Sequence, residues 1–412
     1  MEESDHRPVA LSLFSGAGGL DLGISQAGFN ILACIEIDPY CCDTLRTAIR
    51  HENRPTRVIE ADIRAVHPLE LMHELGLQPG QLDLLFGGSP CQSFSQIGKR
   101  SSLDDERGEL LFQIIRFAEV FRPRTIVAEQ VKGLLTALDK QGKKGGVFDT
   151  FLQNFRDVGY TPHWKVMNAA DYGVPQLRQR IFVVGIAPAN NFSFPLPTHT
   201  KSINAKGLFP LLPYMTVGEA LDGLGELRGK DDRAASNSHV DITPHRDRTR
   251  IHGVPEGSHL AAQLHLPAEQ RCNLTKKDTT KFRRLSRNEP SITLRGGEAF
   301  YHPIEDRYLT PREYMRLHGY PDDYQLKGPI RGRTGTVRNL DQHRQVANSV
   351  PPPVAKYIAE AILRTLACQK YLKSSDTPPV IPVSKLPKTD EPPVVLSWEE
   401  IVMEEEIAIY PV

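Results

Sequence analysis

The stretch Asp83-Leu84-Leu85-Phe86-Gly87-Gly88-Ser89-Pro90-Cys91-Gln92 decides how the rest of the chain is interpreted. Its apolar start predicts a buried strand, and the Gly, Ser and Pro residues that follow predict a loop. In open α/β sheets, ligands bind at the carboxyl ends of the strands. The loop would therefore present Cys91 where a reactive thiol is useful. The alternative is a small, inert, buried cysteine, which is the commoner fate of a free thiol.

The overall composition is that of a soluble globular protein, with 40% hydrophobic and 24% charged residues. The 412 residues are enough for two domains, or for one large domain with an insertion. No apolar run approaches the ~18 residues of a membrane-spanning helix. The polar amino terminus is not a secretory signal. Six cysteines without metal-ligand spacing predict free thiols, no metal site and a reducing compartment such as the cytoplasm.

The formal net charge is zero, but the charge is unevenly distributed. From Tyr371 onward there are 3 basic and 8 acidic residues, which leaves 47 basic and 42 acidic residues before it. Between Arg271 and Arg295 there are 8 basic and 2 acidic residues. A local basic stripe on a neutral protein is the pattern expected of a nucleic-acid contact, although a solvated surface would give the same count.

Apolar runs of strand length alternate with amphipathic runs over the first half of the chain. We expect strands at 8–14, 31–37, 57–60, 83–86, 125–129 and 180–186, and helices after the turn at 15–23 and at 40–51, 108–121 and 147–158. This alternation predicts an α/β fold with a doubly wound, mostly parallel sheet.

The regular pattern ends near residue 187, which predicts a second, smaller and irregular domain. The expected divisions are 1–186 for the first domain, 187–340 for the second, 341–370 for a return to the first, and 371–412 for a Pro-rich acidic tail. Within the second domain, 291–294 is expected to be a short strand. Thr310 to Glu313 predicts a capped helix that ends at Gly319, and a last helix is expected at 353–365.

The turn after the first strand predicts a cofactor site. Glycines at 16, 18 and 19 allow close approach of a ligand, and Glu36 ends the second strand, where an acidic group typically binds ribose hydroxyls. The spacing is Gly-x-Gly-Gly, not the Gly-x-Gly-x-x-Gly that fits a dinucleotide pyrophosphate. S-adenosylmethionine therefore fits better, with Asp62 available to the adenine amino group and Phe14 to its ring. An NAD-type fold is the alternative that the turn alone leaves open.

With these motifs in order, the chain resembles the cytosine-C5 DNA methyltransferases of bacterial restriction–modification systems over nearly all of residues 8–365. The motifs begin at Phe14, Glu36, Asp62 and Gly88 and continue with Arg107-Gly108-Glu109-Leu110-Leu111-Phe112, Glu129-Gln130-Val131-Lys132-Gly133, Gln176-Leu177-Arg178-Gln179-Arg180, Leu309-Thr310-Pro311-Arg312-Glu313 and Gln345-Val346-Ala347-Asn348-Ser349-Val350-Pro351-Pro352. The family usually has Asn where this chain has Gln130, at a position that helps to fix the Pro-Cys loop.

The resemblance implies a Rossmann-like methyltransferase that uses S-adenosylmethionine, with a target-recognition domain at 187–340. The cofactor-binding residues that it implies are Phe14, Gly16, Gly18, Gly19, Leu20, Glu36, Asp62, Ile63, Gly88, Pro90, Leu110, Asn348 and Ser349. The DNA-binding residues that we expect are Gln92, Ser95, Lys99, Arg100, Lys276, Lys277, Arg283 and Arg284.

The chemistry explains why these residue types occur together. A Cys91 thiolate that adds to C6 of cytosine makes C5 nucleophilic, and nearby positive charge would lower the thiol pKa. Glu129 can hydrogen-bond or protonate N3 as negative charge moves onto the ring. Arg178 and Arg180 are expected to supply the positive charge and, by resemblance, to contact the cytosine carbonyl and its phosphate. The target cytosine must be flipped out of the duplex.

The expected substrate is double-stranded DNA, read in a sequence-specific way by a monomeric enzyme, with a cognate restriction endonuclease as a functional partner. Two alternatives remain: a cytosine-C5 methyltransferase that acts on a structured RNA such as tRNA, and a DNA-binding homologue that has lost activity. The large irregular domain favours DNA over tRNA, and the retained Cys91 and Glu129 favour an active enzyme.

Overall fold

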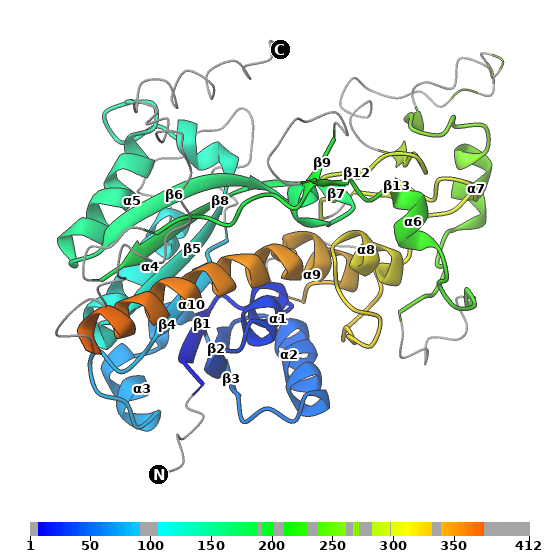
Figure 1. The fold of residues 1–412 in the computed structure, drawn as a ribbon. Coiled ribbons are helices and arrows are strands. Elements are labelled where there is room, and N and C mark those ends of the chain that lie inside the picture. The colour runs from blue at the N-terminus through cyan, green and yellow to red at the C-terminus, as the bar shows by residue number, and fades with distance from the viewer. Residues whose placement is uncertain are drawn as a thin grey trace, which may run out of the picture. The chain divides into compact units, whose positions relative to one another are not determined.

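A seven-stranded sheet organises the first half of the chain (Figure 1). Its spatial order is β3-β2-β1-β4-β5-β8-β6, and β8 alone runs antiparallel to its neighbours. The strands are β1 (Val9–Leu13), β2 (Asn30–Glu36), β3 (Arg57–Glu60), β4 (Leu84–Gly88), β5 (Thr125–Val131), β6 (Thr161–Asn168) and β8 (Gln179–Ile186). The predicted doubly wound, mostly parallel sheet is confirmed.

The computed structural model describes residues 7–90, 106–187, 192–201, 210–229, 238–260, 267, 269, 271, 282–296, 298–331 and 339–374. Its helices are α1 (Gly19–Gln26), α2 (Pro39–His51), α3 (Pro68–Glu74), α4 (Glu106–Phe121), α5 (Gly146–Asp157), α6 (Val217–Leu221), α7 (His245–Ile251), α8 (Pro311–Leu317), α9 (Gln342–Asn348) and α10 (Pro352–Ser374), with short 3-10 turns η1 (Ile63–Ala65), η2 (Lys132–Thr136) and η3 (Ala169–Tyr172). In the part of the chain described, no helix is both long and apolar enough to cross a membrane.

Alternation along the central strands builds two apolar layers. In β4, Leu84 and Phe86 pack with α1, α2 and α10 on one face, whereas Leu85 packs with α3, α4 and α5 on the other. Successive strand side chains point to opposite faces, so a strand covered on both sides must be apolar throughout. This explains why the sequence of β4 has no polar alternation.

Four elements differ from the sequence prediction. No strand is expected at β6, because its sequence is polar and begins Thr161-Pro162; β6 is an edge strand, paired only with β8, where proline is tolerated. The short helices α3 and α9 are also missing from the prediction. The last helix was expected to end at Thr365, but α10 continues to Ser374.

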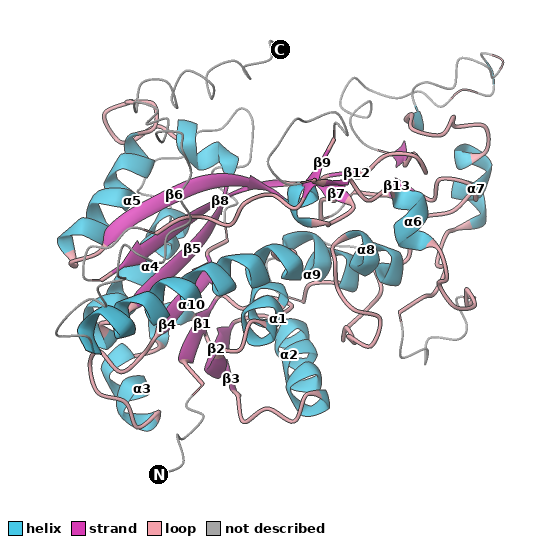
Figure 2. Cartoon of the chain, in the orientation of Figure 1, coloured by secondary structure: helices cyan, strands magenta, loops and turns pink. Residues whose placement is uncertain are grey.

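The region between β8 and α8 consists mainly of loops and two-residue strands (Figure 2). They are β9 (His199–Thr200), which pairs with β10 (Leu212–Pro213); β11 (Arg283–Arg284), which pairs with β13 (Phe300–Tyr301); and β12 (Ser291–Ile292), which pairs with β7 (Gln176–Leu177), the short strand just before β8. Its apolar core also contains Leu22 of α1 and Ala48 of α2. The described residues up to Leu366 form one compact unit, and the division at 187 and 340 stays a prediction.

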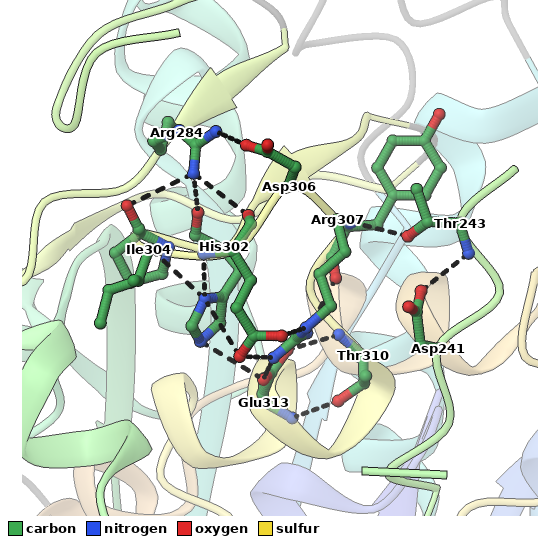
Figure 3. Close-up of polar contacts among 12 residues, drawn as sticks. Asp241, Thr243, Arg284, His302, Ile304, Asp306, Arg307, Thr310 and Glu313 are labelled. Atoms are coloured by element: carbon green, nitrogen blue, oxygen red, sulfur yellow. Dashed lines mark hydrogen bonds and ion pairs between the residues drawn. The ribbon is translucent and has the colours of Figure 1, made fainter. Parts of the chain in front are cut away.

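A buried polar network holds this region to α8 (Figure 3). Thr310 caps α8 and Glu313 completes the predicted capping box. Both Glu313 oxygens also accept from Arg307, at 2.9 and 2.7 Å. His302 lies 3.8 Å from the same carboxylate, and burial lowers its pKa. The network fixes the loop before α8 against the first turn of the helix.

Arg284 belongs to the same region, and its surroundings differ from those of the DNA-binding residue that the sequence predicts. Its side chain is buried and donates to the backbone carbonyls of His302, Glu305 and Ile251, and it also pairs with Asp306 (Figure 3). A guanidinium surrounded in this way is not placed to reach a DNA phosphate, so the predicted phosphate contact at Arg284 is corrected to a structural role. A basic pair in sequence does not distinguish an exposed arginine from one that holds a loop together. Its neighbour Arg283 is half-buried on β11.

Candidate active site

Three strand ends and the end of α9 meet around one pocket of about 50 Å³. The predicted residues that line it are Phe14, Gly16, Gly19 and Leu20 from the turn after β1, Gly88 from β4, Glu129 from β5, and Asn348 and Ser349 from the end of α9. Gly18, Glu36, Asp62, Ile63, Pro90 and Leu110 are not part of this lining. The pocket therefore unites the predicted catalytic carboxylate with about half of the predicted cofactor residues.

The glycines of the turn have two different uses. A Cβ atom added at Gly16 would meet nothing within 4 Å. At Gly19 it would lie 2.2 Å from the Val350 carbonyl, and at Gly23 2.3 Å from the Pro352 carbonyl. Gly16 therefore leaves room at the pocket, whereas Gly19 and Gly23 let α1 pack closely against the chain that leads into α10. The sequence prediction assigned the whole glycine cluster to the ligand.

Glu36 is held at the edge of the turn. Its carboxylate accepts from the Gly16 N–H at 2.7 Å and from the N–H groups of Ile37 and Asp38, both at 2.9 Å. Burial raises the Glu36 pKa, and the three N–H groups oppose that shift. These contacts fix the turn to the end of β2.

Two further predicted cofactor residues lie beyond β3. Asp62 caps η1 and pairs with Arg64 at 2.7 Å. Ile63 is buried and its carbonyl accepts from Arg116 of α4 at 2.6 Å. Leu110, in the first turns of α4, packs against the same apolar layer. These residues stabilise the sheet edge next to the turn.

Glu129 and Arg180 form a buried ion pair beside the pocket. Arg180 Nε lies 3.0 Å from Glu129 Oε1, and their side chains are 17% and 11% exposed. Burial raises the Glu129 pKa, and Arg180 and Arg178 oppose the shift. A Cβ atom at Gly88 would lie 2.8 Å from Glu129 Oε2, so glycine is required where β4 passes the carboxylate.

Arg178 is fully buried and joins three segments. Its Nη2 donates to the carbonyls of Ala347 and Ser349, at 2.9 and 3.0 Å, and its Nη1 donates to Leu294 at 3.3 Å. These bonds tie the start of β8 to the end of α9 and to the residues after β12. Arg178 and Arg180 were predicted to act together, but they lie in different environments.

Gln130 reaches the loop that precedes Cys91. Its Nε2 donates to the Ser89 carbonyl at 3.0 Å and also contacts the Ser89 hydroxyl. Its Oε1 is buried without a hydrogen-bond partner among the described residues. The longer amide thus holds Ser89, while one of its own polar atoms is left unsatisfied.

Asp21 is a pocket residue that the sequence analysis missed. It is 2% exposed, lines the pocket from the first turn of α1, and accepts from the Cys34 thiol at 3.1 Å. Its Oδ2 is buried without a partner among the described residues, and burial raises its pKa. An acidic residue within the otherwise apolar Gly19-Leu20-Asp21-Leu22 stretch is the signal that could have identified it.

Several predicted residues lie outside the described part of the chain. They are Cys91, Gln92, Ser95, Lys99, Arg100, Lys276 and Lys277. Of the loop that presents the cysteine, the structure describes Ser89 and Pro90.

A doubly wound sheet with a glycine turn and a buried carboxylate–arginine pair at one pocket defines a Rossmann-like group-transfer enzyme. The comparison with known families is more specific: the C-5 cytosine-specific DNA methylase family matches residues 9–364, and the chain belongs to this family. The protein is therefore a DNA cytosine-C5 methyltransferase.

Two curated relatives cover most of the chain. The type II methyltransferase M.NgoFVII of Neisseria gonorrhoeae is 34% identical over 88% of this chain and 88% of its own length. The type II methyltransferase M1.HphI of Haemophilus parahaemolyticus is 31% identical over 86% of each chain. The DNMT2 structure from Spodoptera frugiperda has a TM-score of 0.54 at 14% identity, covering 86% of this chain and 99% of its own. That structure supports the fold alone.

Proposed function

We propose that the protein is the modification enzyme of a type II restriction–modification system. It would transfer a methyl group from S-adenosylmethionine to C5 of one cytosine in a specific duplex DNA sequence, through a covalent adduct with Cys91. Family membership and the curated relatives, which are type II methyltransferases, support the class. The observation that carries the proposal is Glu129, a buried carboxylate with a raised pKa, held by Arg180 beside the pocket.

The pocket residues fit S-adenosylmethionine. The unpaired Asp21 Oδ2 offers negative charge to a cationic ligand, and Gly16 leaves room for close approach. Phe14 lies at the mouth of the turn, and Asn348 and Ser349 form the opposite wall. When bound, the cofactor supplies an electrophilic methyl group.

The chain's own residues would activate the base. The Cys91 sulfur adds to C6, electrons move through the ring toward N3, and C5 becomes able to accept the methyl group. A raised Glu129 pKa keeps a proton available for N3, and Arg180, which lies beside it, can donate hydrogen bonds to the polar edge of the same ring. Loss of the C5 proton then allows elimination of the Cys91 thiolate. We assign no residue to the base that takes this proton.

Arg178 takes a different role in this proposal. Because its guanidinium is occupied by backbone carbonyls, it acts as a positioning residue for β8 and for the wall formed by Asn348 and Ser349. Gln130 positions the cysteine loop through Ser89. The predicted monomeric state, the cytoplasmic location and the partner endonuclease stay predictions.

The test is transfer of a labelled methyl group from S-adenosylmethionine to duplex DNA and, in parallel, to tRNA. We expect label at cytosine C5 of the duplex, no label in tRNA, and no transfer by the Cys91→Ser variant. Label in tRNA alone would overturn the substrate, and equal transfer by Cys91→Ser would overturn the covalent route. A covalent complex with 5-fluorocytosine DNA, formed by the wild type and not by the variant, would identify the adduct directly.

A further inference from the structure

The residues that follow β12 are fixed to the catalytic strand. β12 pairs with β7, which leads through Arg178 into β8 (Figure 1). Thr293 Oγ1 donates to the Leu177 carbonyl at 2.7 Å, and the Leu294 N–H donates to Gln176 Oε1 at 3.2 Å. The Arg178 guanidinium donates to the Leu294 carbonyl, and Leu294 itself is 1% exposed. The backbone up to residue 294 is therefore held in a fixed register with the active site.

The chain then emerges at the rim of the pocket. Arg295 has a side chain that is 54% exposed. At Gly296, a Cβ atom would lie 3.5 Å from Asn348 Oδ1 and 3.2 Å from Arg344 Cγ. Asn348 lines the active-site pocket. An exposed guanidinium is thus presented one residue from the pocket wall, on a rigidly anchored segment.

Glu298 orients this guanidinium. Its Oε1 lies 3.4 Å from Arg295 Nη1, its side chain is 12% exposed, and its Oε2 is buried without a partner among the described residues. The Glu298 backbone carbonyl accepts from the buried Tyr314 hydroxyl at 3.3 Å. A carboxylate beside the arginine disfavours a phosphate, which carries the same sign of charge. It does not disfavour a neutral base edge, and the fixed guanidinium retains a second face for hydrogen bonds.

We propose that Arg295 reads a guanine that flanks the target pair, through the O6 and N7 acceptors of the major groove, while Glu298 holds its side chain in place. Arginine bidentate to guanine is the most common specific contact to DNA bases. The inference rests on the proposed sequence-specific methylation and names one of the residues that produce the specificity.

The experiment maps methylated cytosines in a library of DNA duplexes for the wild type and for four variants. Arg295→Ala should reduce discrimination at one guanine position by about 5- to 150-fold, the range for one bidentate contact. Arg295→Lys keeps the positive charge but loses the planar guanidinium that makes two parallel hydrogen bonds, so it should also reduce discrimination at the same guanine position. Glu298→Gln should relax that position to a smaller extent. The matched control is Arg287→Ala, because Arg287 is 51% exposed and also pairs with a carboxylate, that of Glu256; it should leave the site preference unchanged.

The outcomes separate the inference from its rivals. Uniform weakening at all sites by Arg295→Ala, with a smaller dependence on salt and with activity retained by Arg295→Lys, identifies a phosphate contact and overturns base reading. An unchanged preference in both Arg295 variants, or a wild-type site without a fixed flanking guanine, also overturns it. If Arg295→Ala does not fold, Arg295→Lys decides. Failure of the wild type to methylate any cytosine overturns the proposed function instead.

Discussion

Two buried carboxylate–arginine pairs in this enzyme differ in how completely they are satisfied. Glu313 and Arg307 are 1% and 3% exposed, and Glu313 accepts two bonds from Arg307 and one from the Thr310 N–H. Glu129 is 11% exposed, meets Arg180 through one guanidinium nitrogen, and has its other oxygen beside Gly88 of β4. The Glu313 carboxylate is surrounded by hydrogen-bond donors, whereas the Glu129 carboxylate has few.

The number of donors around each carboxylate separates a residue that stabilises the fold from one that takes part in the chemistry. A buried carboxylate with a full set of donors fixes the chain around it. A buried carboxylate with few donors has a raised pKa and can hold or give up a proton, as a general acid must. The same residue types therefore serve a structural role in one region and a catalytic role in the other.

Removing the acid of the Glu129–Arg180 pair should have the largest effect on the rate of methyl transfer. Glu129→Gln keeps the shape and a hydrogen bond to Arg180 but cannot protonate N3. We expect methyl transfer to slow by about 10²- to 10⁴-fold, measured as the initial rate with labelled cofactor and saturating DNA. Binding of DNA should change little, which gel shift would show. A variant with a wild-type rate would remove Glu129 from the chemistry.

The same variant should respond to pH in a defined direction. Because the folded-state pKa of Glu129 is raised, its contribution to stability is full below the ordinary pKa of 4.5 and is lost as pH rises through the folded value. Glu129→Gln removes this loss, so its melting temperature relative to wild type should improve as pH increases from 4 upward. The wild-type rate should fall at pH above the raised pKa, because the proposed mechanism uses the protonated acid. A constant difference in melting temperature across pH would argue against a raised pKa.

Removing the negative charge of the Glu313–Arg307 pair should affect the stability of the fold and not the methylation rate. Glu313→Gln leaves Arg307 buried without its full counter-charge, and breaking such a pair costs about 3–5 kcal/mol. Urea unfolding should show this loss. The methylation rate per folded molecule, at a temperature where the variant is folded, should stay within a few-fold of wild type. A large loss of methylation rate without a loss of stability would show that the Glu313–Arg307 pair is not structural.

Sequence alone was sufficient for the capped helix α8 and for the place of Glu129 at the pocket, whereas the catalytic role of Glu129 stays a prediction. Thr310 to Glu313 carries the capping box in its local spacing, and Glu129 ends an apolar strand beside the one that leads to Cys91. Both features depend on residues close together in the chain or on the known arrangement of parallel strands. The β6 strand was missed because an edge strand need not be apolar.

The environment of each arginine could not be predicted in the same way. Arg178, Arg180 and Arg284 look alike in sequence, each within a short basic motif. Arg178 is buried because segments around residues 294 and 347 return to it from far along the chain, and Arg284 because the loop at 302–306 encloses it. Such long-range contacts have no local signal. Asp21 differs, because its acidic side chain within an apolar stretch is a local signal, although its unpaired oxygen depends on what surrounds it.

Gln130, the neighbour of Glu129, provides a test of how the loop that leads to Cys91 is held. Gln130→Leu keeps the approximate volume but removes the amide that holds Ser89, and an unmade buried hydrogen bond costs about 1–3 kcal/mol. If that energy positions the cysteine loop, methyl transfer should fall about 5- to 150-fold with a small change in melting temperature. Gln130→Asn retains a donor and should keep more activity than Gln130→Leu. Equal activity in both variants would show that the amide does not position the loop.

The smallest expected effect tests whether the network around Glu313 is cooperative. α6 and α8 both begin with a capping box, Thr216 with Glu219 and Thr310 with Glu313. The Thr216 box is exposed, whereas Thr310 is buried and also hydrogen-bonds His239 at 3.0 Å. An N-cap threonine contributes about 1 kcal/mol, within a range of 0.5–2, so we expect Thr310→Ala at the upper end and Thr216→Ala at the lower end. Urea unfolding of both variants and of Thr310→Ala combined with Glu313→Gln measures the coupling. Because Thr310 and Glu313 hydrogen-bond each other, the double variant should lose less than the sum of the single losses, and additivity would show two independent contacts instead of one network.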